Sequence, residues 1–208
     1  MNGNTKWQPS YKFYKGAYNV SRAILGLFFW MDIKGRENIP EGAAMVCSNH
    51  SSLMDPLFMA FAFGKKCYLH FIAKIELFNI PVLSYVISKL GAISVDREMH
   101  DLETIKQTLK YFKNGEKVAI FPEGTRSYVP HEIEAKSGAV KIAERAAVPI
   151  VPIFVPRKKR LFSKMPLIIG KPYYIEKLSG RRSAEEYQQL VRELMDKIEA
   201  LNPAAVVS

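Results

Sequence analysis

The chain has 208 residues, of which 48% are apolar, so it can bury one sizeable core and is too apolar to be disordered throughout. Its formal net charge of +10 equals the charge of two segments that contain no acidic residue, with four cations in 1–31 and six in 157–171. Such segments are typical of proteins that contact anionic lipid, nucleic acid or an acidic protein, although solubility alone would also explain them.

The cysteines and histidines argue against two kinds of stabilising site. Cys47 and Cys67 are the only cysteines, and Cys47 lies in an apolar run, which favours a reducing compartment over a disulfide framework. The four histidines are far apart in the sequence and belong to no HExxH pattern, and no CxxC pattern occurs. We therefore expect no metal site and no disulfide.

The first apolar segment is predicted to be a helix from Ser10 to Met31. Aromatic and aliphatic residues recur at helical spacing, and 23–31 is apolar all round. These nine residues cannot span a bilayer, which needs about 20. Interspersed Lys and Arg favour an amphipathic helix in the membrane interface, and the alternative is a helix packed on the core. We therefore divide the chain into an N-terminal helical membrane anchor over 1–35 and one further domain over 36–208.

The rest of the chain alternates short apolar strands with amphipathic helices. Strands are expected at 43–48, 67–72, 91–95, 117–121, 149–154 and 166–170, and helices at 57–63, 80–90, 102–112, 137–147 and 183–201. Asp101 is the expected cap of the third helix, and Ser183-Ala184-Glu185-Glu186 forms a capping box for the last. This alternation predicts a single-domain α/β layered fold with a central mixed β-sheet flanked by helices.

His50 and Asp55 lie in the turn between the strand at 43–48 and the helix that follows. On one regular helix they would lie about 140° apart, so they meet only if His50 precedes the helix and the chain bends back. Ser51 or Ser52 is then the expected N-cap of the helix. A carboxylate bonded to one imidazole nitrogen leaves the other nitrogen free to act as a base.

Polar turns also follow the strands at 91–95 and 117–121. Arg97 lies in the first of these turns, and Gly124 and Arg126 lie in the second. In open α/β sheets the site lies beyond the carboxyl ends of the strands, so one cleft would combine the His-Asp pair with both turns. Arginine forks suit a phosphate ester, and a glycine lets the backbone approach a ligand closely.

Four sequence blocks in this order resemble a known family. They are His50-x4-Asp55, Gly91-x-Ile93-x3-Arg97, the run Phe121-Pro122-Glu123-Gly124-Thr125-Arg126-Ser127, and Val148-Pro149-Ile150-Val151-Pro152-Ile153, with Lys74-x-Glu76-Leu77 between the first two. Each block is weak alone, but their order and spacing resemble those of the 1-acylglycerol-3-phosphate acyltransferases (the PlsC-like lysophosphatidic acid acyltransferases). The resemblance covers nearly the whole chain.

The resemblance implies transfer of a fatty acyl group from a thioester of CoA or acyl carrier protein to the sn-2 hydroxyl of 1-acyl-sn-glycerol 3-phosphate. The product would be phosphatidic acid, in phospholipid biosynthesis, and no cofactor would be needed. His50 would be the general base and Asp55 would orient it. The substrate-binding residues that it implies are Lys74, Arg97, Glu123, Gly124, Thr125 and Arg126, with the phosphate on Arg126. An alternative role for Glu123 is that of a structural hydrogen-bonding group.

Several alternatives stay open at this point. A sister acyltransferase acting on glycerol 3-phosphate or another lysolipid would carry the same blocks, and neither the donor nor the chain length can be read from them. A basic nucleic-acid-binding module would explain the charge, but no DNA- or RNA-binding motif is present, so we expect no nucleic-acid partner. A serine hydrolase of the α/β type would need a Gly-x-Ser-x-Gly motif, which is absent. Because the acceptor lies in a bilayer, we expect a peripheral, monotopic protein on the cytoplasmic face of the cell membrane, bound to an anionic surface.

Overall fold

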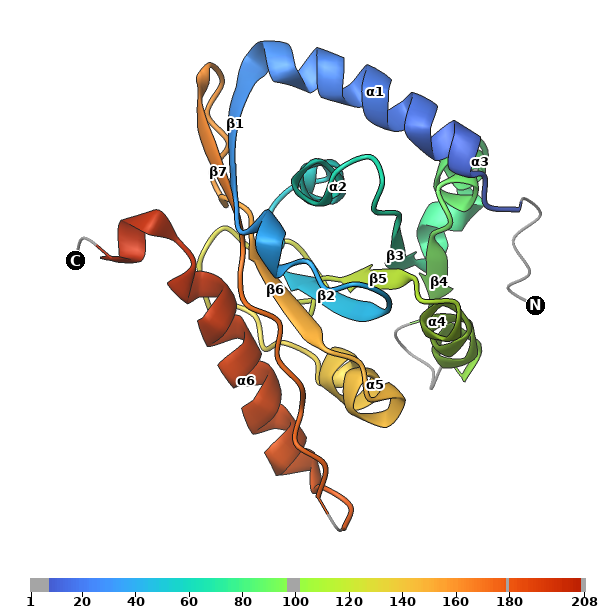
Figure 1. Ribbon diagram of the computed structural model, residues 1–208, viewed down its shortest axis with the longest axis vertical. Helices are drawn as coiled ribbons and strands as arrows, with labels where there is room; N and C mark the ends of the chain where they lie inside the picture. The colour runs from blue at the N-terminus through green and yellow to red at the C-terminus, as the bar shows by residue number, and fades with distance from the viewer. Residues whose placement is uncertain (1–7, 97–101, 179, 207–208) are drawn as a thin grey trace.

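The computed structural model describes residues 8–96, 102–178 and 180–206, and a seven-stranded sheet forms its centre (Figure 1). The strands are β1 (Phe29–Lys34), β2 (Ala44–Ser48), β3 (Leu69–Lys74), β4 (Ile93–Val95), β5 (Lys117–Ile120), β6 (Ile150–Phe154) and β7 (Ser163–Ile169). The helices are α1 (Tyr11–Phe28), α2 (Asp55–Phe63), α3 (Pro81–Lys89), α4 (Leu102–Lys113), α5 (Gly138–Ala146) and α6 (Ala184–Ala200), with 3-10 helices η1 (Arg36–Asn38), η2 (Ile75–Asn79) and η3 (Pro203–Val206).

The sheet has the order β1-β7-β6-β2-β5-β3-β4 and is mixed. β6 and β7 pair antiparallel, whereas the other neighbouring strands pair parallel. The predicted α/β fold with a central mixed sheet and flanking helices is therefore confirmed.

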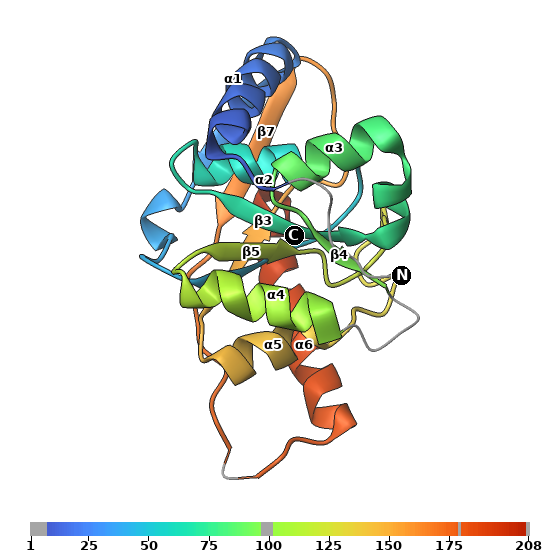
Figure 2. The same cartoon turned by 90° about the vertical axis from the view of Figure 1, so that its right-hand side faces the viewer.

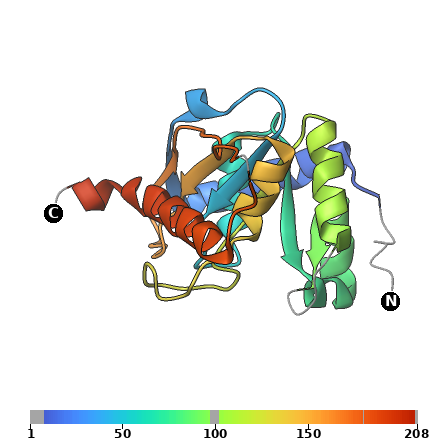
Figure 3. The same ribbon diagram turned by 90° about the horizontal axis from the view of Figure 1, so that it is seen from below.

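Helices cover both faces of the sheet, which is why its central strands read as continuous apolar runs. Met45 and Cys47 of β2 face a core that they share with α4, α5 and α6. Ala44 and Val46 face the opposite core, with α2 and β7. Figure 2 shows α1, α2 and α3 on one side of the sheet and α4, α5 and α6 on the other, and Figure 3 shows α6 crossing its face.

The register of the central strands brings three turns to one edge. β2 lies between β5 and β6 and runs parallel to both, with Cys47 opposite Ile120 and Ser48 opposite Ile153. The segments that follow β2, β5 and β6 therefore leave the sheet side by side. β3 and β4 end at the same edge, where Lys74 pairs with Val95. As predicted, the polar turns after β2 and β5 meet beyond the carboxyl ends of the strands, while the turn predicted after β4 continues into 97–101, outside the described residues.

The N-terminal segment differs from the prediction in its second half. The helix expected to reach Met31 ends at Phe28, and the following residues form β1, which pairs with β7. The periodicity of such a short apolar run does not distinguish a helix from a strand. Here residues 29–34 form a strand because they pair with the edge of β7. The division of the chain at residue 35 stays a prediction, although β1 lies before it and belongs to the sheet. The predicted cap Asp101 lies outside the described residues.

Helix α1 packs on the domain through one face only. The Tyr14 hydroxyl is buried and donates to the Cys67 carbonyl over 3.0 Å. The Tyr18 ring meets the Phe61 ring of α2 edge to face, with 5.4 Å between centroids. The sequence left two interpretations of this helix, and packing on the core is the one that describes this face. The opposite face of α1 is exposed to solvent.

Candidate active site

His50 and Asp55 meet in the turn between β2 and α2. His50 Nδ1 lies 2.9 Å from Asp55 Oδ2, and the two side chains are 16% and 1% exposed. The imidazole stacks on the Phe121 ring, with 4.0 Å between centroids. His50 precedes the helix and the chain bends back, as the sequence predicts. Nδ1 is turned to the carboxylate, so Nε2 is the nitrogen that can serve a substrate.

The prediction that Ser51 or Ser52 caps α2 is wrong. The helix begins at Asp55, and its N-cap is Met54, which makes no side-chain capping bond. Asp55 Oδ2 instead accepts the backbone N–H groups of Ser51 and Ser52, each over 2.7 Å. The turn therefore closes around a carboxylate at the start of the helix, which suits the positive end of the helix dipole better than a hydroxyl does.

Lys159 binds the second oxygen of the same carboxylate. Its Nζ lies 2.6 Å from Asp55 Oδ1, and its side chain is 6% exposed. Burial opposes the ionisation of Asp55, but the hydrogen bond from His50 and the charge of Lys159 outweigh it and hold the pKa of Asp55 below its ordinary value. Burial also lowers the pKa of Lys159, against the attraction of Asp55. Because Asp55 is an acceptor on both oxygens, His50 Nδ1 carries the proton and Nε2 keeps its lone pair.

A second buried ion pair holds the backbone of His50. The Glu123 carboxylate accepts the His50 N–H over 2.5 Å and the Arg157 guanidinium over 2.7 Å. Arg157 also donates to Glu199 of α6 over 2.5 Å and to the Ser127 carbonyl over 2.8 Å. The Ser127 N–H in turn donates to the His50 carbonyl over 2.9 Å. Both oxygens of Glu123 are thus engaged by the protein, which favours the structural hydrogen-bonding role that the sequence left open.

The other predicted substrate-binding residues lie at the same edge of the sheet. Gly124 is buried and has a φ of +70°, a backbone conformation that favours glycine. Thr125 and Arg126 follow it in the same turn, and both are exposed. Lys74 ends β3, beside β5, and is also exposed. Arg97 lies outside the described residues, so the structure does not place it.

Arg157 and Lys159 are the functional residues that the sequence analysis missed. They were counted in the basic segment 157–171 as a surface charge, and the structure corrects this, since Arg157 is buried, the Lys159 side chain is only 6% exposed, and both are ion-paired. The chain bends at 157–158 after β6, so no strand or helix periodicity of the sequence could have placed these two side chains at the site.

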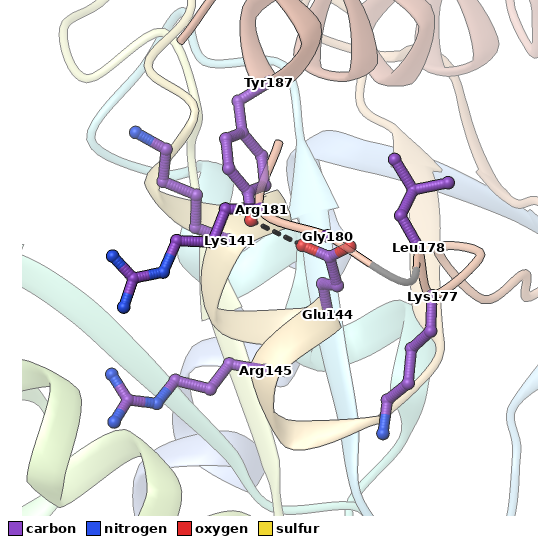
Figure 4. A pocket seen from close by; sticks show the side chains of 8 residues that line it. All are labelled: Lys141, Glu144, Arg145, Lys177, Leu178, Gly180, Arg181 and Tyr187. Atoms are coloured by element: carbon purple, nitrogen blue, oxygen red, sulfur yellow. Dashed lines mark hydrogen bonds between the residues drawn. The ribbon is translucent and has the colours of Figure 1, made fainter. Parts of the chain in front are cut away.

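A hollow of about 500 Å³ lies elsewhere, between α5 and the start of α6 (Figure 4). Lys141, Arg145, Lys177 and Arg181 are among its lining residues, and Glu144 accepts the Tyr187 hydroxyl there over 2.6 Å. Tyr187 lines the hollow near the start of α6. Glu199, which bonds Arg157 in the His50 network, lies about 18 Å further along the axis of the same helix. The hollow is therefore separate from the candidate active site. Among the residues that the structure describes, no group of three His, Cys, Asp or Glu side chains could hold a metal ion.

Comparison with known proteins identifies the family. A family model described as "Acyltransferase" matches residues 31–156, which include the dyad, the turn after β5 and all of β6. The chain belongs to this acyltransferase family. It is 33% identical over 195 residues to the 1-acyl-sn-glycerol-3-phosphate acyltransferase of Bacillus subtilis, covering 90% of this chain and 96% of that protein. It is 26% identical over 207 residues to the enzyme of the same name from Saccharomyces cerevisiae, covering 92% of this chain and 66% of that protein.

A solved structure supports the same assignment. The crystal structure of the 1-acyl-sn-glycerophosphate (LPA) acyltransferase PlsC from Thermotoga maritima matches with a TM-score of 0.65 and 27% sequence identity. The match covers 93% of this chain and 80% of that one. The family that the four blocks predicted is therefore confirmed, and the fold is the one found in a solved member.

Proposed function

We propose that this acyltransferase moves a fatty acyl group from a thioester of CoA or acyl carrier protein to the sn-2 hydroxyl of 1-acyl-sn-glycerol 3-phosphate. The product is phosphatidic acid. The observation that carries the proposal is the 2.9 Å contact between His50 and Asp55 at the carboxyl edge of the sheet. The names of the relatives support the choice of acceptor.

The geometry supports direct transfer without an acyl-enzyme. His50 Nε2 takes the proton of the acceptor hydroxyl while the hydroxyl oxygen attacks the thioester carbonyl, and Asp55 stabilises the imidazolium that forms. The C–S bond of the tetrahedral intermediate then breaks, and the thiolate receives the proton from His50. A thiol with a pKa of about 8.5 leaves readily, so no stronger acid is required.

The acceptor phosphate is assigned to exposed cations at the same edge. Arg126 lies two residues after the buried Gly124, in the turn whose Glu123 holds the His50 backbone. Lys74 lies at the end of the neighbouring strand, and Arg97 is the third cation that the family blocks imply. A guanidinium can bind a phosphate through two parallel hydrogen bonds, which would fix the acceptor hydroxyl relative to Nε2.

A matrix of acceptors and donors tests this function. Lysophosphatidic acid, glycerol 3-phosphate and a lysolipid without a terminal phosphate are each offered with acyl-CoA and with acyl carrier protein, and products are read by mass. We expect transfer to lysophosphatidic acid, with the new chain at sn-2. His50→Ala should lower the rate by at least about 10²–10⁴-fold, while His131→Ala, at an exposed histidine, should not. Transfer only to glycerol 3-phosphate, or a near-normal His50→Ala rate, would overturn the proposal.

We also propose that the protein binds the cytoplasmic face of the cell membrane through one apolar surface. The apolar patch consists of Val20, Ile24, Leu27, Phe28, Trp30, Leu161 and Phe162, each at least 39% exposed. The Phe162 N–H donates to the Phe28 carbonyl over 2.6 Å, so the end of α1 and the loop before β7 lie side by side (Figure 1). Lys158, Arg160 and Lys164 add exposed charge in or beside that loop.

This patch fits an interface better than a transmembrane position. No helix within the described ranges is long and apolar enough to cross a bilayer. Apolar side chains would enter the lipid, and each nearby cation would contribute about 1 kcal/mol on an anionic surface. Binding should therefore be reversible and only partly sensitive to salt.

Cosedimentation with anionic and neutral vesicles, at low and high salt, tests the surface. The double variant Leu27→Ser/Phe162→Ser should lose the salt-resistant part of the binding. Leu102→Ser is the matched control, because Leu102 is 65% exposed on α4, on the other side of the sheet. Wild-type binding by the double variant would place the membrane contact elsewhere.

A further inference from the structure

Lys159 is bonded like a structural cation inside the dyad rather than like a ligand-binding lysine. Its Nζ lies 2.6 Å from Asp55 Oδ1 and 2.8 Å from both the Ser51 hydroxyl and the Pro156 carbonyl. Nζ donates hydrogen bonds to the Ser51 hydroxyl and the Pro156 carbonyl, and it is ion-paired with Asp55. Lys159 is therefore engaged by the protein itself, in contrast to the exposed Arg126.

The two oxygens of Asp55 have different partners. Oδ2 receives His50 Nδ1 and two backbone N–H groups of the turn. Oδ1 is buried and has Lys159 as its cation. Without that cation a buried carboxylate oxygen would lack a charge partner, which is costly, and only the bonds to Oδ2 would hold the carboxylate against His50.

We propose that Lys159 is a positioning residue of the acyl transfer, which holds the Asp55 carboxylate against His50 and offsets the negative charge of that carboxylate. This inference rests on the proposed role of His50 as the general base. Lys159 lies outside the four sequence blocks, and by this proposal it helps to set the pH range in which the enzyme works.

The charges around His50 give the sign of the effect. Asp55 is paired with Lys159, while Glu123 bonds the His50 N–H and is paired with Arg157, which also binds Glu199. Removing the charge of Lys159 leaves Asp55 unopposed, and an unopposed carboxylate favours the imidazolium. A charge at this range moves a titration by about one unit or more. Because a general base must be unprotonated, the acid limb of kcat/KM should move to higher pH by the same amount.

The test uses three variants of the full chain in detergent. Lys159→Met removes the charge and the donors, and Lys159→Gln removes the charge but keeps an amide donor. Lys113→Met is the control, since Lys113 is an exposed cation at the end of α4. The imidazole of His50 is titrated by NMR, with its signal assigned from His50→Ala, and kcat/KM for lysophosphatidic acid is measured across pH.

We expect the His50 titration midpoint and the acid limb to rise together by about one pH unit in both Lys159 variants and to stay unchanged in Lys113→Met. The kcat should fall further in Lys159→Met than in Lys159→Gln, because only the amide can still donate to Asp55. If Lys159→Met fails to fold, as judged by thermal unfolding, Lys159→Gln carries the test.

A wild-type titration midpoint in Lys159→Gln would overturn the proposal. The NMR titration does not need turnover, so a failure of the proposed acyltransferase function can be distinguished from a failure of the role proposed for Lys159. A wild-type chain that is inactive on every acceptor, with a His50 titration that still moves in Lys159→Gln, would reject the proposed function and support the electrostatic coupling.

Discussion

Replacing Arg157 with methionine tests whether a buried ion pair holds the turn that carries His50. The guanidinium is 7% exposed and bonds the carboxylates of Glu123 and Glu199 and the carbonyl of Ser127. Methionine has a similar length and no charge, so Arg157→Met leaves Glu123, whose side chain is 1% exposed, as a buried carboxylate without its cation.

The loss of stability should be large. Removing one partner of a buried pair typically costs about 3–5 kcal/mol, because the other charge stays desolvated. We expect a fall of that size in the free energy of unfolding, measured by urea denaturation at pH 7. Burial raises the pKa of Glu123 even with Arg157 present, so without Arg157 the folded state should take up a proton more readily. The loss should therefore be smaller at pH 5 than at pH 8.

Two variants control for nonspecific effects. Arg160→Met removes an exposed cation of the same loop and should change stability by no more than about 0.5 kcal/mol. Glu123→Gln/Arg157→Met removes the buried charge as well, and should recover part of the loss. A loss below about 1 kcal/mol for Arg157→Met, well under the range for a broken buried pair, or no recovery in the double variant, would refute the reasoning.

Three further predictions follow from the site and the core. Asp55→Asn should lower kcat by about 10²–10⁴-fold with little change in acceptor KM in steady-state assays, since the amide no longer holds the imidazole tautomer; a large KM effect would contradict this. Arg126→Ala should lower kcat/KM for lysophosphatidic acid but not for a lysolipid without a terminal phosphate, and Arg126→Lys should restore it only in part; equal losses would remove the phosphate role. Burial lowers the pKa of His70 to about 4, below an ordinary value of about 6.5, so the unfolded chain binds the proton first. The free energy of unfolding, measured with urea at both pH values, should fall by about 3 kcal/mol as pH drops from about 6.5 to about 4. In His70→Gln this pH-dependent loss should be absent.

The elements that the sequence predicted well are those with a clear pattern. The runs at 43–48 and 117–121 are apolar and short, and they became β2 and β5. The capping box from Ser183 to Glu186 forms as expected, with both of its bonds present. Patterns of this kind depend on neighbours within one turn or one strand, so the local sequence contains the information that decides them.

The apolar run 23–31 shows where local information ends. Its residues suit a helix and a strand equally, and the chain changes from one to the other between Phe28 and Phe29. The position of that change depends on the edge of β7, more than 130 residues further along the chain. The predicted capping of α2 by a serine was wrong because the turn closes before the helix begins: Ser52 Oγ accepts the Met54 N–H over 3.2 Å, while Asp55 accepts the N–H groups of Ser51 and Ser52.

The sequence by itself determined that a histidine and a carboxylate lie at a strand-to-helix turn, because a buried strand and an apolar helix flank them, and that they meet only if the chain bends back before the helix. Only the tertiary structure decided what holds that pair. Arg157 and Lys159 read as surface charge, yet the pairing of β6 with β2 brings them against Glu123 and Asp55. A buried ion pair forms when two distant segments are packed together tightly enough to exclude water, and that condition belongs to the sheet rather than to either segment.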